Sequence, residues 1–142
     1  ASLLVRDIGR QNMGLTLDFG HCLMATENPV QSWSLTGQEG KLFGVQMNDG
    51  FVKPGCEDGL ALGTVHPRMT LEFIYWLQRI DYKGHIYFDT FPINEDPVCE
   101  AEYNIRLYKK WWKFASVLDA KGIGELLIKQ DTMSILKLLE DQ

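Results

Sequence analysis

The chain has 142 residues, of which 45% are hydrophobic and 23% are charged, as in an ordinary globular domain with a buried core. Its 14 basic and 19 acidic side chains give a net charge of −5, and the only basic cluster is formed by Lys109, Lys110 and Lys113. This composition excludes a fibrous or disordered chain. It also argues against a nucleic-acid partner, because binding to phosphates needs concentrated positive charge.

The sequence has no apolar run near the roughly 20 residues that span a bilayer, and no basic-then-apolar leader. We therefore expect a cytoplasmic protein without a membrane partner. The cysteines, Cys22, Cys56 and Cys99, form no Cys-x-x-Cys pair, which fits reduced thiols in the cytosol. Cys22 follows His21 directly, but we expect it to act as a small buried hydrophobe rather than as a thiolate.

Hydrophobic periodicity and breaker residues predict alternating helices and strands. In chain order we expect a helix over 2–8, a strand over 13–19, a helix over 26–35 capped by Thr26, a strand over 42–47, a long loop over 50–63, a helix over 70–80 opened by Pro67, a strand over 85–88, a helix from Pro97 to about 118 capped by Asp96, and a final leucine-rich stretch over 125–139. In the long helix we expect Ile105, Tyr108, Trp112 and Ala115 to face inward.

Nearly continuous apolar strands separated by helices are typical of a parallel α/β sheet covered by helices. Three such units cannot close a barrel, which takes about eight units, so the sheet would keep two unpaired edges. The chain also begins in what looks like the end of a helix, so we expect that preceding sequence has been removed. We expect Val45, Met47, Ile86 and Phe88 to be exposed in an isolated chain, and hence a homo-oligomer in which these faces meet.

Polar residues follow all three predicted strands. Asp18 and His21 follow the first, Asn48 and Asp49 the second, and Asp89 the third. Since the carboxyl ends of parallel strands meet at one edge of a sheet, these side chains could form one site. The alternative for Asp18 is a helix cap or turn residue, and the alternative for Asp89 is a turn former.

Several segments carry a resemblance to a known family. They are LDFGHCLMATENP, VQMNDG, CEDGLALGTVHP, TLEFIYWLQRIDYKG and HIYFDTFP, in that order, between Ile8 and about Ala115. Together they resemble the carboxy-terminal part of the xylose-isomerase-like barrel family of sugar isomerases and epimerases, in particular its L-rhamnose-isomerase-like and sugar 3-epimerase branches. The resemblance implies that residues 1–142 are a single portion of a TIM-type (β/α)8 barrel, strands six to eight, with 119–142 as a terminal helical extension.

The resemblance also implies a divalent metal, manganese, cobalt, magnesium or zinc, held by carboxylates and an imidazole. Asp18 and Asp89 match metal ligands of the family, and His21 matches the imidazole that contacts a substrate oxygen. Asp89 and His21 would then be the catalytic residues of this chain, and Phe91 could stack on the sugar. Hard oxygen ligands suit such cations.

Two positions need separate treatment. Gln46 stands where the family has a histidine ligand, and a neutral amide binds transition metals more weakly than imidazole. Glu57 and Asp58 stand where the rhamnose-isomerase-like branch has acidic ligands of a second metal, but the same pair could be an ordinary loop turn. The family's catalytic glutamate lies on a preceding strand that this chain does not contain.

The leading hypothesis is a metal-dependent sugar isomerase or epimerase that acts on a small unphosphorylated sugar. The alternative is a non-catalytic, degenerate or truncated paralogue that self-associates or binds sugar, which Gln46 and the missing strand favour. Relatives of this barrel that cut damaged DNA are a third possibility, and the acidic net charge argues against it.

Overall fold

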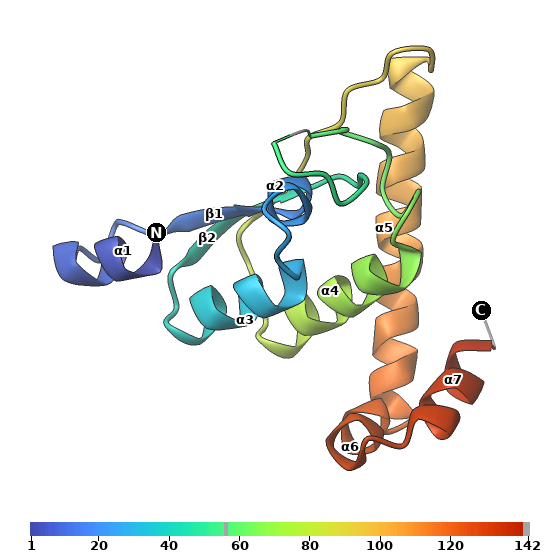
Figure 1. The fold of residues 1–142 in the computed structure, drawn as a ribbon. Coiled ribbons are helices and arrows are strands. Elements are labelled where there is room, and N and C mark those ends of the chain that lie inside the picture. The colour runs from blue at the N-terminus through green and yellow to red at the C-terminus, as the bar shows by residue number, and fades with distance from the viewer. Residues whose placement is uncertain (56, 141–142) are drawn as a thin grey trace.

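A three-stranded parallel sheet lies at the centre of the computed structural model, which describes residues 1–55 and 57–140 (Figure 1). Its strands are β1 (Leu15–Asp18), β2 (Leu42–Met47) and β3 (His85–Phe88), in the order β1-β2-β3. Both neighbouring pairs are parallel. The expected parallel α/β arrangement is therefore confirmed for the described residues, with β1 and β3 as edge strands.

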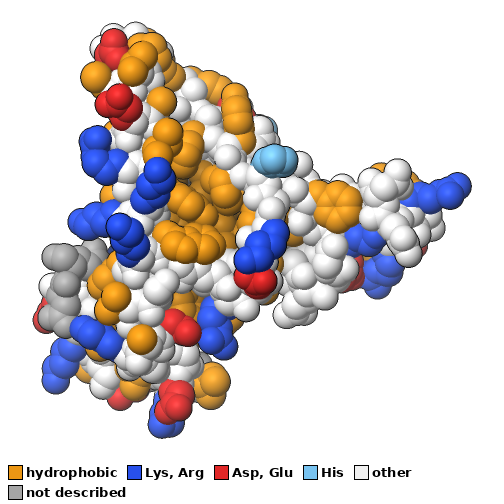
Figure 2. Space-filling model, turned by 180° about the vertical axis from the view of Figure 1, so that it is seen from behind, with side chains coloured by type: hydrophobic (Ala, Val, Ile, Leu, Met, Phe, Trp, Pro, Cys, Tyr) orange, Lys and Arg blue, Asp and Glu red, His pale blue; other side chains and the backbone are white. Residues whose placement is uncertain are grey.

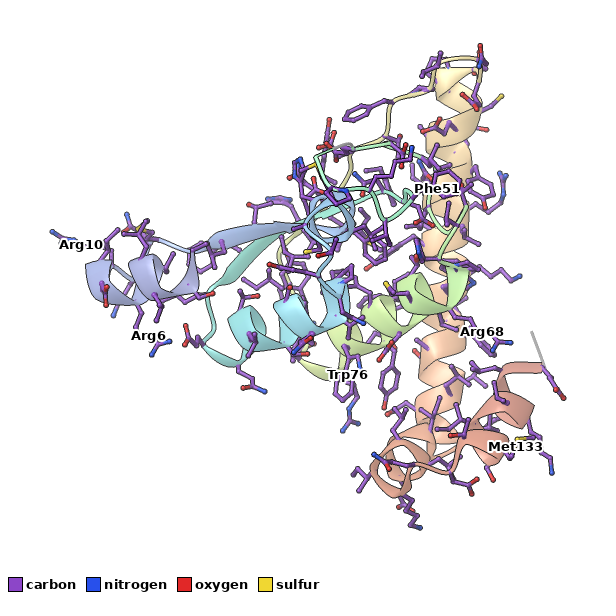
Figure 3. The ribbon with its side chains drawn as sticks, in the orientation of Figure 1. Arg6, Arg10, Phe51, Arg68, Trp76 and Met133 are labelled. Atoms are coloured by element: carbon purple, nitrogen blue, oxygen red, sulfur yellow. The ribbon has the colours of Figure 1, made fainter. Side chains whose placement is uncertain are left out.

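Seven helices accompany the sheet in the described part of the chain. They are α1 (Ser2–Ile8), α2 (Phe19–Met24), α3 (Pro29–Gln38), α4 (Pro67–Arg79), α5 (Pro97–Ala120), α6 (Ile123–Lys129) and α7 (Thr132–Glu140). Figure 1 shows α3 and α4 below the sheet, α2 and the 50–63 loop at the carboxyl ends of the strands, and α5 running across the end of the molecule. Arg6 on α1 and Met133 on α7 mark opposite ends of the structure (Figure 3).

The two faces of the sheet differ in exposure. Val45 and Met47, expected to be exposed, are 1% and 0% exposed, and Ile86 and Phe88 are half-buried. The expectation for Val45 and Met47 was wrong because their face of the sheet is the one that the helices cover. The other face is polar and open, with Tyr87 60% exposed.

The turn after β1 holds a helix that the sequence pattern did not predict. Asp18 caps α2 directly, and Thr26, the expected cap of the next helix, instead follows α2 with a φ of 58°. Asn28 is the cap of α3, and its Oδ1 accepts from the N–H groups of Val30 (2.8 Å) and Gln31 (3.1 Å). The predicted start at Thr26 was therefore two residues early.

Aromatic packing forms the centre of the core. Phe73 on α4 makes edge-to-face contacts with Phe19 and Trp33, at centroid distances of 5.6 and 6.3 Å. Phe73 and Phe19 are fully buried, and Trp33 is 1% exposed. Trp33 is thus a core residue. Such edge-to-face pairs add about 0.5–1.5 kcal/mol each to the burial of their area.

Helix α5 buries a slightly different face from the predicted one. Trp111, Ala115 and Leu118 are buried, whereas Ile105, expected inward, is 45% exposed. Tyr108 is half-buried against the ring of Phe88. After α5, the expected final stretch is divided into α6 and α7 at Gln130, whose φ is 55°.

Cys22 is buried and Cys99 is exposed, while Cys56 lies outside the described residues. Burial raises the pKa of the Cys22 thiol to about 11, which confirms the expected buried hydrophobe. Within the part of the chain that is described, no helix combines the length and hydrophobicity needed to cross a membrane.

Candidate metal centre

Asp18 ends β1 and begins α2, so one side chain belongs to both elements. Its Oδ1 accepts from the backbone N–H of His21 at 3.0 Å, which is the usual bond of a helix N-cap. The cap alternative for Asp18 is therefore correct. The same turn brings His21 Nδ1 to 3.3 Å from Asp18 Oδ2, so capping also positions the imidazole beside the carboxylate.

Glu57, in the long loop after β2, completes a three-residue cluster. Its Oε2 lies 3.0 Å from His21 Nε2. Asp18, His21 and Glu57 each offer a ligand atom, and these atoms lie within 4.8 Å of one another. Asp18 is only 6% exposed, and its Oδ2 is buried without a hydrogen bond in the structure. The cluster thus contains a buried carboxylate oxygen that has the His21 imidazole beside it and makes no hydrogen bond to a described residue.

Asn48, fully buried after the end of β2, connects the parts of this site. Its Nδ2 donates to Glu57 Oε1 at 3.0 Å and to the backbone oxygen of Asp89 at 2.9 Å, and lies 3.5 Å from Asp18 Oδ1. Its Oδ1 accepts from the N–H of Gly20 at 2.7 Å. The sequence reasoning assigned Asn48 no individual role. The only available signal was its position in the strand-end Asn48-Asp49 turn.

Asp89 lies at the same edge of the sheet but has a different partner. Its Oδ2 accepts a hydrogen bond from Gln46 Nε2 at 2.9 Å. Gln46 is in turn the residue of β2 that pairs with Asp18 of β1. The backbone N–H of Asp89 donates to Met47 at 3.2 Å, which holds it beside β2. The structure therefore brings Asp89 and Gln46 together as a pair, next to the three-residue cluster.

Asp58 points to a different place from its neighbour Glu57. Its carboxylate accepts from the N–H of Phe51 (2.7 Å) and from Lys53 Nζ (3.1 Å), both in the exposed part of the loop. These bonds, that of the Phe51 N–H first, hold the pKa of Asp58 below its usual range. The loop-turn alternative therefore describes Asp58 well, and the structure places no other described site residue against it.

The buried Asp49 has a structural role. Its Oδ2 accepts from the N–H groups of Val65 and His66, both at 2.8 Å, and its Oδ1 lies 2.9 Å from His66 Nδ1. His66 thus packs at the start of α4. These bonds fix the end of the 50–63 loop and thereby the stretch that carries Glu57.

Phe91 lies over the loop rather than beside the cluster. Its N–H donates to the backbone oxygen of Gly59 at 2.8 Å, and its ring covers Gly59 so closely that a Cβ there would collide with it. Gly59 also has a φ of 58°, so glycine is favoured twice at this position. Phe91 is 47% exposed, and a sugar contact for it stays a prediction.

The electrostatics of the cluster favour a positive charge. Burial, followed by the carboxylates of Asp18 and Asp89, raises the pKa of Glu57 above its ordinary range, while His21 and Asn48 act in the opposite direction. Several acids close together disfavour one another's ionisation unless a cation joins them. The arrangement can therefore bind a divalent cation through two carboxylates and one imidazole.

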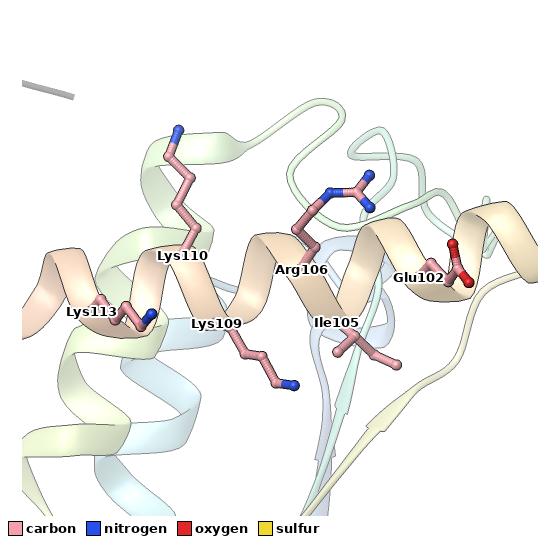
Figure 4. Close-up of a pocket in the computed structure, with 6 residues that line it drawn as sticks. All are labelled: Glu102, Ile105, Arg106, Lys109, Lys110 and Lys113. Carbon is pink, nitrogen blue, oxygen red and sulfur yellow. The ribbon is translucent and has the colours of Figure 1, made fainter.

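Asp18, His21 and Gln46 line one open groove of about 490 Å³ along the free edge of β1. A larger hollow of about 650 Å³ lies on α5, where Arg106 joins the three lysines noted in the sequence (Figure 4). That hollow has only Glu102 as a carboxylate. The chemistry of the side chains, not the size of the hollow, therefore identifies the candidate site.

No protein-family model matches the chain, and no curated protein matches it.

Proposed function

We propose that Asp18, His21 and Glu57 bind a divalent cation, and that the chain contributes this site to a metal-dependent sugar isomerase or epimerase. The observation that carries the proposal is the convergence of three potential ligand atoms within 4.8 Å, from β1, α2 and the loop after β2. The motif resemblance, which implies the same chemistry at Asp18 and in the Glu57 loop, supports it.

The residues present fit such a cation. Asp18 Oδ2 is buried and makes no hydrogen bond to a described residue, although the His21 imidazole lies 3.3 Å away, and a buried carboxylate oxygen in this state is stabilised by a positive group. Two carboxylates and an imidazole suit manganese, cobalt or zinc, and the carboxylates also suit magnesium. When bound, the cation would polarise an oxygen of the sugar.

Protein side chains would supply the remaining chemistry. Asp89 would take up and return a proton at a carbon next to the carbonyl, through Oδ1, since Oδ2 accepts a hydrogen bond from Gln46 Nε2. The resemblance implies a further glutamate on a strand before β1, and the described sheet ends at β1 on that side.

Titration with Mn²⁺, followed by calorimetry and electron spin resonance, tests the site. We expect one site, and a loss of affinity of about tenfold or more in Asp18→Asn and in Glu57→Gln, since even outer-shell changes reduce metal affinity by about that amount. Asparagine is also a good helix cap, so Asp18→Asn removes a ligand charge while keeping α2. Asp58→Asn, at the neighbouring acid, is the matched control.

Absence of Mn²⁺ binding, or an equal loss in Asp58→Asn, would contradict the metal site. Formation of a ketose from aldoses, or of an epimer from ketoses, tests the reaction. It should disappear in Asp89→Asn while Mn²⁺ still binds.

A second candidate is a sugar-binding protein without catalysis. The specific observation in its favour is that the neutral side chain of Gln46 donates a hydrogen bond to the Asp89 carboxylate. Sugar binding that does not depend on Mn²⁺ and leads to no conversion would favour this candidate.

A further inference from the structure

The open face of the sheet places polar and aromatic side chains in a row across the strand ends. Asp18 on β1 is the register partner of Gln46 on β2, and Gln46 is the register partner of Tyr87 on β3. Because side chains alternate along a strand, all three belong to the face opposite the buried Val45 and Met47. The row therefore runs from the metal cluster across the open sheet.

Gln46 and Asp89 together present two hydrogen-bond acceptors to this face. The Gln46 amide donates to Asp89 Oδ2, and neither Gln46 Oε1 nor Asp89 Oδ1 has a further bond to a described residue. Adjacent hydroxyls of a polyol can donate hydrogen bonds to such a pair of acceptor oxygens. If the Gln46 side chain rotated to ligate a metal, the Asp89 carboxylate would lose the amide donor that now stabilises it.

Tyr87 adds an apolar surface at the end of the row. Its side chain is 60% exposed on the edge strand β3, where its ring meets no other described aromatic. Aromatic rings offer an apolar face together with a polar hydroxyl, which suits the mixed surface of a sugar. Gly44, two residues before Gln46 on β2, lies on the same face, with Thr16 and His85 as its register partners. A Cβ at this position would come within 2.8 Å of Thr16 Oγ1, so glycine keeps this part of the face free of a side chain.

Of Gln46, Asp89 and Tyr87, Gln46 alone lines the groove that Asp18 and His21 also line, so a small ligand in that groove would meet the row at Gln46. The groove, about 490 Å³, is in the range of small-molecule sites. We infer that Gln46, Asp89 and Tyr87 form a subsite for the vicinal hydroxyls of a polyol, beside the metal cluster, and that Gln46 is not a metal ligand. The identity of the polyol as a sugar substrate rests on the proposed function.

The test combines two readouts on the full 142-residue chain. Saturation-transfer NMR with free aldopentoses, ketopentoses and xylitol, in the presence of Mg²⁺, reports binding of polyols. Calorimetric titration with Mn²⁺ reports the metal site. Gln46→Met keeps the length of the side chain but removes its acceptor and donor, and Tyr87→Ala removes the ring. Tyr103→Ala on α5 is the control for loss of a partly exposed tyrosine.

We expect Gln46→Met and Tyr87→Ala each to weaken polyol binding by about tenfold, the effect of one hydrogen bond or one ring contact, with Mn²⁺ affinity unchanged. A tenfold fall in Mn²⁺ affinity in Gln46→Met would make Gln46 a ligand and overturn the inference. Equal polyol binding by all variants, or none by the wild type, would overturn it as well. Failure of the proposed metal site is separate, since it would appear as absence of Mn²⁺ binding in the wild type.

Discussion

Asp18 divides its two carboxylate oxygens between folding and chemistry. Oδ1 accepts the N–H of His21 and starts α2, while Oδ2 lies buried beside the imidazole without a hydrogen bond. Because the cap fixes the carboxylate, the free oxygen keeps its position without a ligand. At this scale a residue that sequence reasoning treats as either a cap or a ligand is able to serve as both.

The raised pKa of Glu57 leads to a prediction about stability. Since its pKa in the folded chain lies above the ordinary value of 4.5, folding favours the protonated form, and the ionised form is a cost at neutral pH. We expect Glu57→Gln to raise the melting temperature of the metal-free protein at pH 7. The gain should shrink as the pH falls through the raised pKa and vanish below 4.5.

Thermal melts of wild type and Glu57→Gln at pH 7 and pH 4 check this prediction. Asp58→Asn serves as the contrast, because its pKa lies below the usual range. Its carboxylate contributes stability above its ordinary pKa of 3.8, so Asp58→Asn should lower the melting temperature at pH 7. A lower melting temperature at pH 7 in Glu57→Gln would count against the repulsion described for the cluster.

Individual residues show where sequence reasoning succeeds and where it ends. Asp18 and His21 were predictable because strand ends gather at one edge of a parallel sheet. Glu57 and Asp58 were indistinguishable in the sequence, since the direction of each side chain depends on the path of the loop. The role of Asn48 depends on partners 9 to 41 residues away, which no local pattern reveals.

At the scale of elements, the starts of α4 and α5 were predictable because a polar residue is followed by proline, whereas the start of α3 was predicted two residues early, at Thr26. Pro29, Pro67 and Pro97 are the first residues of α3, α4 and α5. Helix α2 was not predictable, because six residues are too few to show helical periodicity. Its formation displaced the next helix start from Thr26 to Asn28–Pro29.

The cap of α5 provides a test of this local reasoning. Asp96 accepts from the N–H groups of Val98 (3.0 Å) and Cys99 (2.8 Å). We expect Asp96→Ala to lower the free energy of unfolding, and Asp96→Asn to retain most of the wild-type value, since asparagine caps nearly as well. Urea denaturation measures both. Equal losses in the two variants would show that charge, rather than capping, is the source of the effect.

At the scale of the whole molecule, the described helices cover one face of the sheet, and β1 and β3 are edge strands with no further described strand beside them (Figure 1). The sequence predicted the edge strands correctly. It predicted exposure for Val45 and Met47, which are buried, because the pattern of a short apolar strand does not reveal which face of the sheet the helices cover. Figure 2 shows apolar side chains gathered in a hollow beside α5, bordered by Lys and Arg side chains. Ile105, 45% exposed, and the half-buried Tyr108 and Trp112 are on α5.

Self-association is the prediction that belongs to this scale, because free strand edges and exposed apolar surface favour pairing. We expect a mass above the 16.2 kDa of the monomer in light scattering, decreasing on dilution. Ile105→Lys should shift the equilibrium toward the monomer by about tenfold, the effect of removing one apolar anchor. Ile128→Lys, at an 86% exposed isoleucine on α6, is the control. A monodisperse monomer at every concentration would contradict the prediction.

The one-sided cover of the sheet also separates two sets of residues that evolution or a designer could vary. Val45 and Met47 hold the core, whereas Gln46, between them in the sequence, reaches only the open face. Neighbouring positions of one strand can therefore change under independent constraints. Ligand preference could be altered at Gln46 or Tyr87 by saturation libraries with little loss of folded protein, while the same libraries at Val45 or Met47 would mostly yield unfolded chains.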